Sequence, residues 1–274
     1  MTDRFEKIDP AERWFFDVLS MGEPPGFFVL EDVEMTAAQE LMQQMRKRGV
    51  RVTYTHIVVR ATAVALSRHA DLNRLILGNK LVYPGTLDIG ISVSSSDSKA
   101  TQPSMILQDA GRKTLAQLAQ EIAERGRQVR EGNRERVAKL RKVAKMMPIP
   151  WVRRAVLRLM KSKMSMVRKH TGAFHVTSIP HLSVGIPFKY PTPAVLTFPR
   201  VEERVVVRNG QPVIRLMTTL GFSGDHRLWQ ANTAAIILQE VKKILEEGEL
   251  NAEALGDISE ITLDAVSKNA MKAS

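Results

Sequence analysis

Residues 221–229 have the sequence Gly221-Phe-Ser-Gly-Asp-His-Arg-Leu-Trp229, which predicts the end of a β-strand, a glycine-bearing turn and the start of a long helix. Catalytic groups often occupy such junctions, because the strand fixes the backbone while the turn leaves a side chain accessible. His226 lies in this turn, and imidazole is the group best matched to removing a proton near neutral pH. By itself, the motif Asp225-His226-Arg227 is better explained by a histidine that is paired for structural reasons. Of the other five histidines we interpret His56 and His69 as structural, and the remaining three have no spacing that assembles a metal site.

On both sides of this segment the sequence alternates between predicted strands and helices. Two strands are expected at Ala194 to Val207 and Val213 to Phe222, because Asn209-Gly210 between them is a strong hairpin signal. A helix follows from about Leu228 to Glu247. The other expected elements are strands at 27–33, 87–94, 105–108 and 173–179 and helices at 36–48, 54–69 and 114–125. Strands and helices in this irregular order favour an α/β fold, a two-layer sandwich with helices packed on one mixed sheet.

Several of these segments, in this order, resemble one known family. The segments are Ala61-Thr-Ala-Val-Ala-Leu-Ser-Arg-His-Ala-Asp-Leu-Asn73, Leu87-Asp-Ile-Gly-Ile-Ser-Val93, Gln108-Asp-Ala-Gly-Arg-Lys-Thr-Leu115, Thr171-Gly-Ala-Phe-His-Val-Thr-Ser178 and Phe222-Ser-Gly-Asp-His-Arg-Leu228. Together they resemble the catalytic domain of the dihydrolipoamide acyltransferases of 2-oxoacid dehydrogenase complexes and, more distantly, chloramphenicol acetyltransferase. The resemblance covers residues 27 to 247 apart from one basic segment, and the ordered set is far more specific than any single motif.

This resemblance implies a function and a set of site residues. His226 matches the family's general base, which takes the proton from a thiol of coenzyme A or dihydrolipoamide so that the thiol attacks an acyl carbonyl directly. Thr177 matches the hydroxyl that stabilises the negatively charged tetrahedral intermediate; without the resemblance it is an ordinary β-branched strand residue. The family's active site lies between subunits, so the resemblance implies a homotrimer.

The chain departs from the family pattern at several positions. The Asp or Asn four residues after the histidine, and the Gly that follows it, are replaced by Gln230 and Ala231. Glutamine still forms hydrogen bonds but supplies no carboxylate, so we expect Asp225 and Gln230 to act only as supporting residues. The family's segment along the coenzyme channel is replaced by the polar stretch 94–101 and Ser104-Met-Ile-Leu107. The resemblance therefore supports the fold more strongly than it supports coenzyme A binding. We also expect no lipoyl domain in this chain.

Composition limits the class of protein further. The 274 residues contain no cysteine, which excludes disulfides, Cys-ligated metal sites and a cysteine nucleophile, and fits a cytoplasmic location. No signal peptide or spanning segment is evident. The formal net charge is +11, but 125–169 holds sixteen basic residues and only Glu131 and Glu135 as acidic ones. The rest of the chain is therefore slightly acidic. We expect an extension at 1–26, a catalytic domain at 27–248 interrupted by a basic insertion at about 134–169, and a tail at 249–274.

The basic insertion predicts two amphipathic helices separated by Pro148-Ile149-Pro150, with methionine and valine on their apolar sides. Such helices cover a substrate pocket, bind a protein partner, lie on an anionic membrane surface or pack on the protein's own core. Nucleic acid is a weaker interpretation, because the helices lack interleaved aromatic residues. For the whole chain, the alternative to an acyltransferase is a catalytically silent trimer that keeps the fold as a scaffold, which the loss of the Asp-Gly pair favours.

Overall fold

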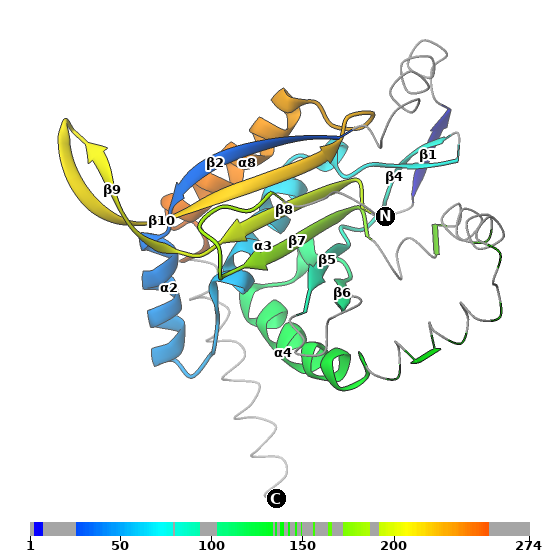
Figure 1. The fold of residues 1–274 in the computed structure, drawn as a ribbon, viewed down its shortest axis with the longest axis horizontal. Coiled ribbons are helices and arrows are strands. Elements are labelled where there is room, and N and C mark those ends of the chain that lie inside the picture. The colour runs from blue at the N-terminus through cyan, green and yellow to red at the C-terminus, as the bar shows by residue number, and fades with distance from the viewer. Residues whose placement is uncertain are drawn as a thin grey trace, which may run out of the picture.

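The computed structural model describes residues 3–7, 26–78, 80–93, 103–133, 172–186 and 192–251, together with a few positions between 135 and 165. Its centre is a seven-stranded sheet in which β2, β10, β8, β7, β5 and β6 are neighbours in that order and β9 also pairs with β10 (Figure 1). The strands are β2 (Gly26–Glu34), β5 (Ile89–Ser92), β6 (Ser104–Leu107), β7 (Phe174–Ile179), β8 (Ala194–Pro199), β9 (Glu202–Arg208) and β10 (Gln211–Asp225). β7 runs parallel to β5 and β8, and the other pairs are antiparallel, so the expected mixed sheet is confirmed.

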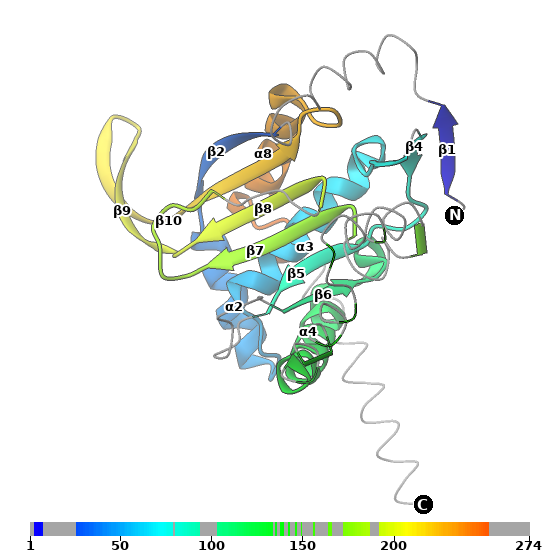
Figure 2. The same ribbon diagram turned by 45° about the vertical axis from the view of Figure 1, so that its right-hand side comes forward.

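Helices form the second layer, on one side of this sheet (Figures 1 and 2). They are α2 (Thr36–Lys47), α3 (Tyr54–Arg68), α4 (Leu115–Glu131) and α8 (Ala231–Glu246). α3 is the central helix, because it packs against α2, α4 and α8. Apolar side chains between the two layers form one cluster that includes Phe174, Phe222 and Trp229, each at most 1% exposed. The two-layer α/β sandwich expected from the sequence is therefore confirmed.

One strand prediction is wrong. The expected single strand from Ala194 to Val207 is two strands, β8 and β9, which pair with different parts of β10. β8 ends at Pro199, whose ring nitrogen donates no hydrogen bond to a sheet ladder. The hairpin between β9 and β10 is confirmed, because Asn209 and Gly210 both have positive φ angles, 51° and 76°, as a tight hairpin turn requires.

A small second sheet was not predicted. It contains β1 (Arg4–Lys7), β4 (Lys80–Tyr83) and β3 (Leu75–Leu77), in that order. The guanidinium of Arg4 lies 4.7 Å from the ring centroid of Tyr83, the residue that it faces across the two strands. Part of the expected N-terminal extension is thus attached to the domain by strand pairing.

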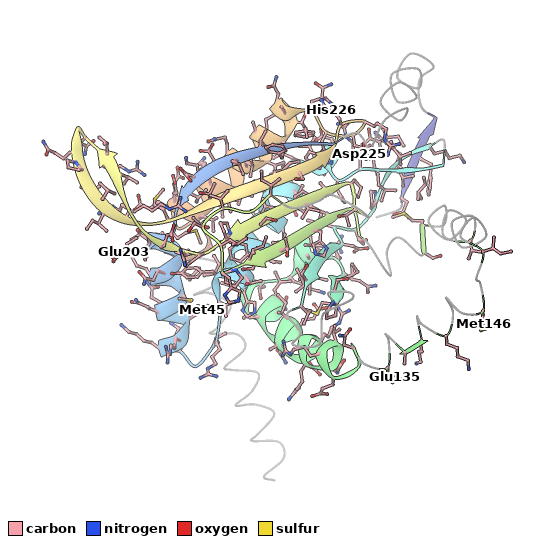
Figure 3. All side chains as sticks on the ribbon, viewed as in Figure 1. Met45, Glu135, Met146, Glu203, Asp225 and His226 are labelled. Atoms are coloured by element: carbon pink, nitrogen blue, oxygen red, sulfur yellow. The ribbon has the colours of Figure 1, made fainter. Side chains whose placement is uncertain are left out.

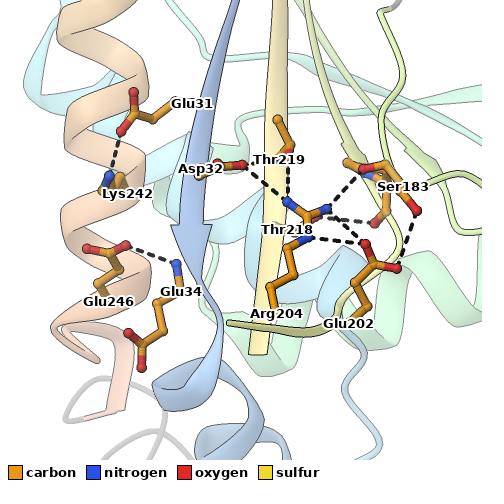
Figure 4. Close-up of polar contacts among 11 residues, drawn as sticks. Glu31, Asp32, Glu34, Ser183, Glu202, Arg204, Thr218, Thr219, Lys242 and Glu246 are labelled. Carbon is orange, nitrogen blue, oxygen red and sulfur yellow. Dashed lines mark hydrogen bonds and ion pairs between the residues drawn. The ribbon is translucent and has the colours of Figure 1, made fainter. Parts of the chain in front are cut away.

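A polar network fixes the edge of the large sheet (Figure 4). Arg204 of β9 donates to Thr219 of β10 at 2.9 Å, to Asp32 of β2 at 3.3 Å and to the backbone oxygen of Ser183 at 3.2 Å. It also bonds Glu202 at 3.1 Å. These contacts join β9, β2, β10 and the segment after β7, so the hairpin is anchored where it leaves the sheet.

Most of the basic segment at 134–169 lies outside the described residues, as do the chain from 252 onward and the polar stretch at 94–101. Two methionines of the basic segment are described and differ in their surroundings. Met146 is 74% exposed, whereas Met164 packs against a small cluster of Leu75, Val82 and Ala173. The prediction of two amphipathic helices stays a prediction. Among the helices that the structure does describe, we find none of the length and hydrophobicity that a membrane crossing needs.

Candidate active site

His226 lies directly after β10, at the end of the longest strand of the sheet (Figure 3). Residues 217–225 of β10 pair with β2 without interruption, and the last pair is Asp225 with Gly26. The turn is closed by the backbone oxygen of Asp225, which accepts the N–H groups of Leu228 and Trp229 at 2.8 Å each. The position of the histidine backbone is therefore set by a fully paired strand on one side and a hydrogen-bonded turn on the other.

The carboxylate of Asp225 is engaged by Arg227. Its Oδ1 accepts from the backbone N–H of Arg227 at 3.1 Å and from Nε at 3.0 Å, and its Oδ2 accepts from Nη2 at 2.7 Å. Asp225 is only 6% exposed, and these hydrogen bonds raise the pKa of the Arg227 guanidinium. These hydrogen bonds stabilise the turn that carries His226, and the supporting role expected of Asp225 stays a prediction.

The imidazole of His226 is half-buried and packs against one aromatic ring. The ring of Phe27 lies 5.3 Å from it, centroid to centroid, at an interplanar angle of 64°. The Nδ1 atom is buried and has no hydrogen-bond partner among the described residues. The residue as a whole is only half-buried, so part of it is open to solvent.

Gln230 is the N-cap residue of α8 and is exposed. Its side chain caps no backbone N–H of the helix, and no hydrogen bond joins it to His226 within the described part of the chain. The residue four positions after the histidine is therefore close in sequence, but within the described residues no hydrogen bond joins it to the imidazole.

Thr177 lies in β7, half-buried, and the sheet register sets its distance from His226. Thr177 pairs with Thr197 of β8, which in turn pairs with Gly221 of β10. His226 lies five residues beyond Gly221, which corresponds to about 16 Å along the strand, and two strand spacings add about 10 Å across the sheet. The two backbones are thus separated by roughly 19 Å. A base and an oxyanion donor each need to be about 3 Å from the reacting atoms, so the structure does not bring His226 and Thr177 of one chain together.

His175 and Ser92 form a polar pair that sequence reasoning missed. His175 lies two residues before Thr177 in β7 and therefore on the same sheet face. Its Nε2 is 3.0 Å from the Oγ atom of Ser92, and its ring fills the space above Gly90, where a Cβ would be 2.4 Å from Nδ1. Burial lowers the pKa of His175 to about 4, so the imidazole is neutral at pH 7. Side chains alternate between the two faces of a strand, so the spacing of two residues could have placed His175 on the same face as Thr177 from the sequence alone.

His56 has the structural role that we expected. Its Nδ1 accepts the backbone N–H of Thr53 at 3.2 Å, which completes a capping box at the start of α3. Burial lowers its pKa to about 4. A cavity of about 780 Å³ is lined by residues that include Arg4, Asn73 and Arg112, but by neither His226 nor Thr177. Over the described ranges, no group of three or more acidic or histidine side chains is arranged to hold a metal.

Comparison with known proteins agrees with the order of motifs. A sequence model of the family described as 2-oxoacid dehydrogenases acyltransferase (catalytic domain) matches residues 18–137 and 153–252. The chain belongs to this acyltransferase family. The match is interrupted inside the basic segment, and it includes the strands that carry His226 and Thr177.

Individual relatives of this family member are distant and longer. The succinyltransferase component of the 2-oxoglutarate dehydrogenase complex of Cupriavidus necator is 28% identical over 225 residues, which are 79% of this chain and 46% of the relative. The lipoamide acyltransferase component of the branched-chain alpha-keto acid dehydrogenase complex of Bacillus subtilis is 26% identical over 205 residues, 73% of this chain and 41% of the relative. The chain therefore spans less than half of each of these curated relatives.

Solved structures support the same fold for this family member. A probable dihydrolipoamide acetyltransferase from Listeria monocytogenes has a TM-score of 0.64 at 20% identity, with 88% of this chain and 94% of that chain covered. A chloramphenicol acetyltransferase has a TM-score of 0.52 at 13% identity and covers 88% of this chain and 100% of its own. The identities are low, so these likenesses concern the fold.

Proposed function

We propose that this protein is an acyltransferase that moves an acyl group between coenzyme A and a thiol or another acceptor. The observation that carries the proposal is the half-buried His226, which a paired strand end holds in a chain that belongs to the acyltransferase family. In this proposal His226 is the general base and Thr177 is the oxyanion donor. Coenzyme A or acyl-coenzyme A is a substrate, and the reaction uses no metal.

The proposed reaction is direct transfer. Nε2 of His226 takes the proton from the attacking thiol, and the sulfur forms a bond to the acyl carbonyl carbon. The carbonyl oxygen becomes negatively charged in the tetrahedral intermediate, and the hydroxyl of Thr177 donates a hydrogen bond to it. When the intermediate collapses, the bond to the leaving thiolate breaks and the imidazolium returns the proton to that sulfur. The histidine ends as it began, so no acyl-enzyme is needed.

We further propose that the active site forms between subunits of a homotrimer, or of an assembly built from trimers. The argument is the separation of roughly 19 Å between His226 and Thr177 in one chain, which is far more than a single reacting group spans. One related structure is the cubic core of a pyruvate dehydrogenase multienzyme complex. Mass measurement of the purified protein in solution tests this, and a monomer that is fully active would contradict it.

Supporting roles are proposed for Asp225 and Gln230. Asp225 fixes the turn through Arg227, so it acts on the backbone that carries the histidine. The Azotobacter vinelandii dihydrolipoamide acetyltransferase was studied for the role of a serine, a histidine and, four residues later, an asparagine in its catalytic mechanism. Gln230 occupies the corresponding fourth position after His226, where its amide can bind a substrate group but with a longer side chain.

The proposal is tested by His226→Gln and a panel of acyl-coenzyme A substrates of increasing chain length, with dihydrolipoamide as the acceptor. Release of free coenzyme A is measured by chromatography. We expect His226→Gln to abolish transfer and the matched variant His69→Gln, at the end of α3, to retain it. Transfer at the wild-type rate by His226→Gln would show that the base is assigned wrongly.

A second candidate function is a catalytically silent trimer that acts as a scaffold. The observation that favours it is Gln230, which is exposed and makes no hydrogen bond to His226 within the described residues. Thermal unfolding with coenzyme A and acyl-coenzyme A separates the two, because a ligand that binds only the native state raises Tm. Stabilisation together with transfer supports the enzyme; neither effect, in a folded trimer, supports the scaffold.

The basic segment at 134–169 is proposed to act beside the active site or at a surface outside it. Its charge and apolar methionines suit a lid over an acyl chain, a binding site for a protein partner, or contact with the anionic surface of a membrane. We propose that the protein is located in the cytoplasm or peripherally at the membrane. Liposome flotation with and without anionic lipid tests the membrane role. Absence of salt-sensitive binding to anionic vesicles would rule out the membrane role.

A further inference from the structure

Phe27 of β2 and Gly224 of β10 are paired across the two strands. Only one further pair lies between them and the turn that carries His226. β2 and β10 are antiparallel, and the register places Phe27 opposite Gly224 and Gly26 opposite Asp225. Strand pairing therefore places Phe27 close to His226, although the two residues are far apart in the sequence.

Gly224 is the reason that the ring of Phe27 can lie where it does. A Cβ atom at this position would be 2.8 Å from Cε1 of Phe27 and 2.9 Å from Cε1 of Phe222. Both distances are far shorter than a carbon–carbon van der Waals contact. The two phenyl rings, whose centroids are 6.0 Å apart, thus occupy the volume that a side chain on β10 would take.

From this position the ring of Phe27 meets the imidazole of His226 edge to face, with centroids 5.3 Å apart and planes at 64°. Ring nitrogens of catalytic histidines are usually oriented by a hydrogen bond on the nitrogen that does not react. Here Nδ1 of His226 is buried and no described residue is its partner. Nδ1 therefore lacks such a hydrogen bond within the described part of the chain, and the ring of Phe27 packs edge to face against the imidazole.

We propose that Phe27 is a positioning residue, which holds the imidazole of His226 so that Nε2 faces the substrate, and that Gly224 provides the space for it. This inference rests on the proposed function, in which His226 is the general base. Phe27 touches neither substrate nor reacting atoms in this arrangement and acts through the histidine.

The test compares Phe27→Leu with Phe28→Leu. Phe28 is the next residue of β2, points to the opposite sheet face and is 58% exposed, so it is a matched control of the same residue type. We expect Phe27→Leu to lower kcat by about 10- to 100-fold with little change in KM, because small displacements of a catalytic group cost rates of this order. Phe28→Leu keeps the wild-type kcat. Phe27→Tyr retains the ring and restores most of the activity.

A second readout does not depend on activity. With histidine labelled at the ring carbons, His226→Gln identifies the His226 signal, and Phe27→Leu is expected to shift that signal while leaving the signal of His69 unchanged. Equal kcat and equal His226 signals in Phe27→Leu and wild type would overturn the proposal. If the wild type transfers no acyl group, the proposed function fails by itself, and the ring signal alone then supports or overturns the role of Phe27.

Discussion

Mixing two inactive variants tests whether the active site is shared between chains. The variants are His226→Ala, which keeps the hydroxyl of Thr177, and Thr177→Val, which keeps the histidine. Valine has the shape of threonine and suits a strand, so Thr177→Val removes only the hydroxyl, and we expect it to lower transfer by about 10²–10³-fold. Thr197→Val is the matched control, because it removes a buried hydroxyl that pairs across from Thr177 and has no partner among the described residues.

The activity expected of mixed trimers follows from the distance between His226 and Thr177. His226 and Thr177 of one chain are roughly 19 Å apart, so each site takes the histidine from one subunit and the hydroxyl from the next. In a cyclic trimer that contains both variants, in either ratio, one of the three interfaces joins an intact histidine to an intact hydroxyl. Mixed trimers should therefore recover about one third of the wild-type activity per trimer.

The assay uses the two variants co-expressed with different affinity tags and purified on both tags in sequence, so that every trimer is mixed. Native mass spectrometry confirms the composition, and coenzyme A release gives the rate. Mixed trimers that are no more active than either parent would refute the shared site, since a site within one chain lacks one group in every subunit.

Three further predictions concern stability. Gly224→Ala should destabilise the fold by about 1–3 kcal/mol in urea unfolding, because the added Cβ overlaps the ring of Phe27; an unchanged midpoint would contradict the packing. Arg204→Ala should cost about 1–3 kcal/mol, because it leaves the partly buried network at the sheet edge without its donor. His56 has its pKa lowered from 6.5 to about 4, so the unfolded chain binds more protons between these values and stability is lost as the pH falls below 6.5. His56→Gln, which retains the capping box, should reduce the loss between pH 7 and pH 5 by up to about 2 kcal/mol, and an unaltered pH dependence would show that His56 is not its source.

Local signals in the sequence predicted most elements of the fold. The helices α3 and α8 follow from apolar residues at helical spacing, and the β9–β10 hairpin follows from Asn209-Gly210, because these preferences act within a few residues of chain. The division of Ala194 to Val207 into two strands was missed, since residues that favour strands lie on both sides of Pro199 although β8 ends there. The pairing of β1 with β4 was missed because it joins residues more than seventy positions apart.

The candidate site also contains features that the sequence predicted and features that it did not. The resemblance in ordered motifs pointed to His226 and Thr177, and the family match supports the resemblance without testing the roles of these residues. The engagement of Asp225 by Arg227 follows from two neighbouring residues in a turn. The pair of His175 with Ser92 and the contact of Phe27 with His226 had no local signal, because each joins segments that are distant along the chain.

The sequence by itself determined the α/β character, the family and the histidine at the end of a strand, because periodicity, turn chemistry and motif order are properties of short segments. Only the tertiary structure decided which side chains meet. Strand register places Phe27 against His226 and sets Thr177 roughly 19 Å away from it, and register depends on the alignment of segments that are distant along the chain.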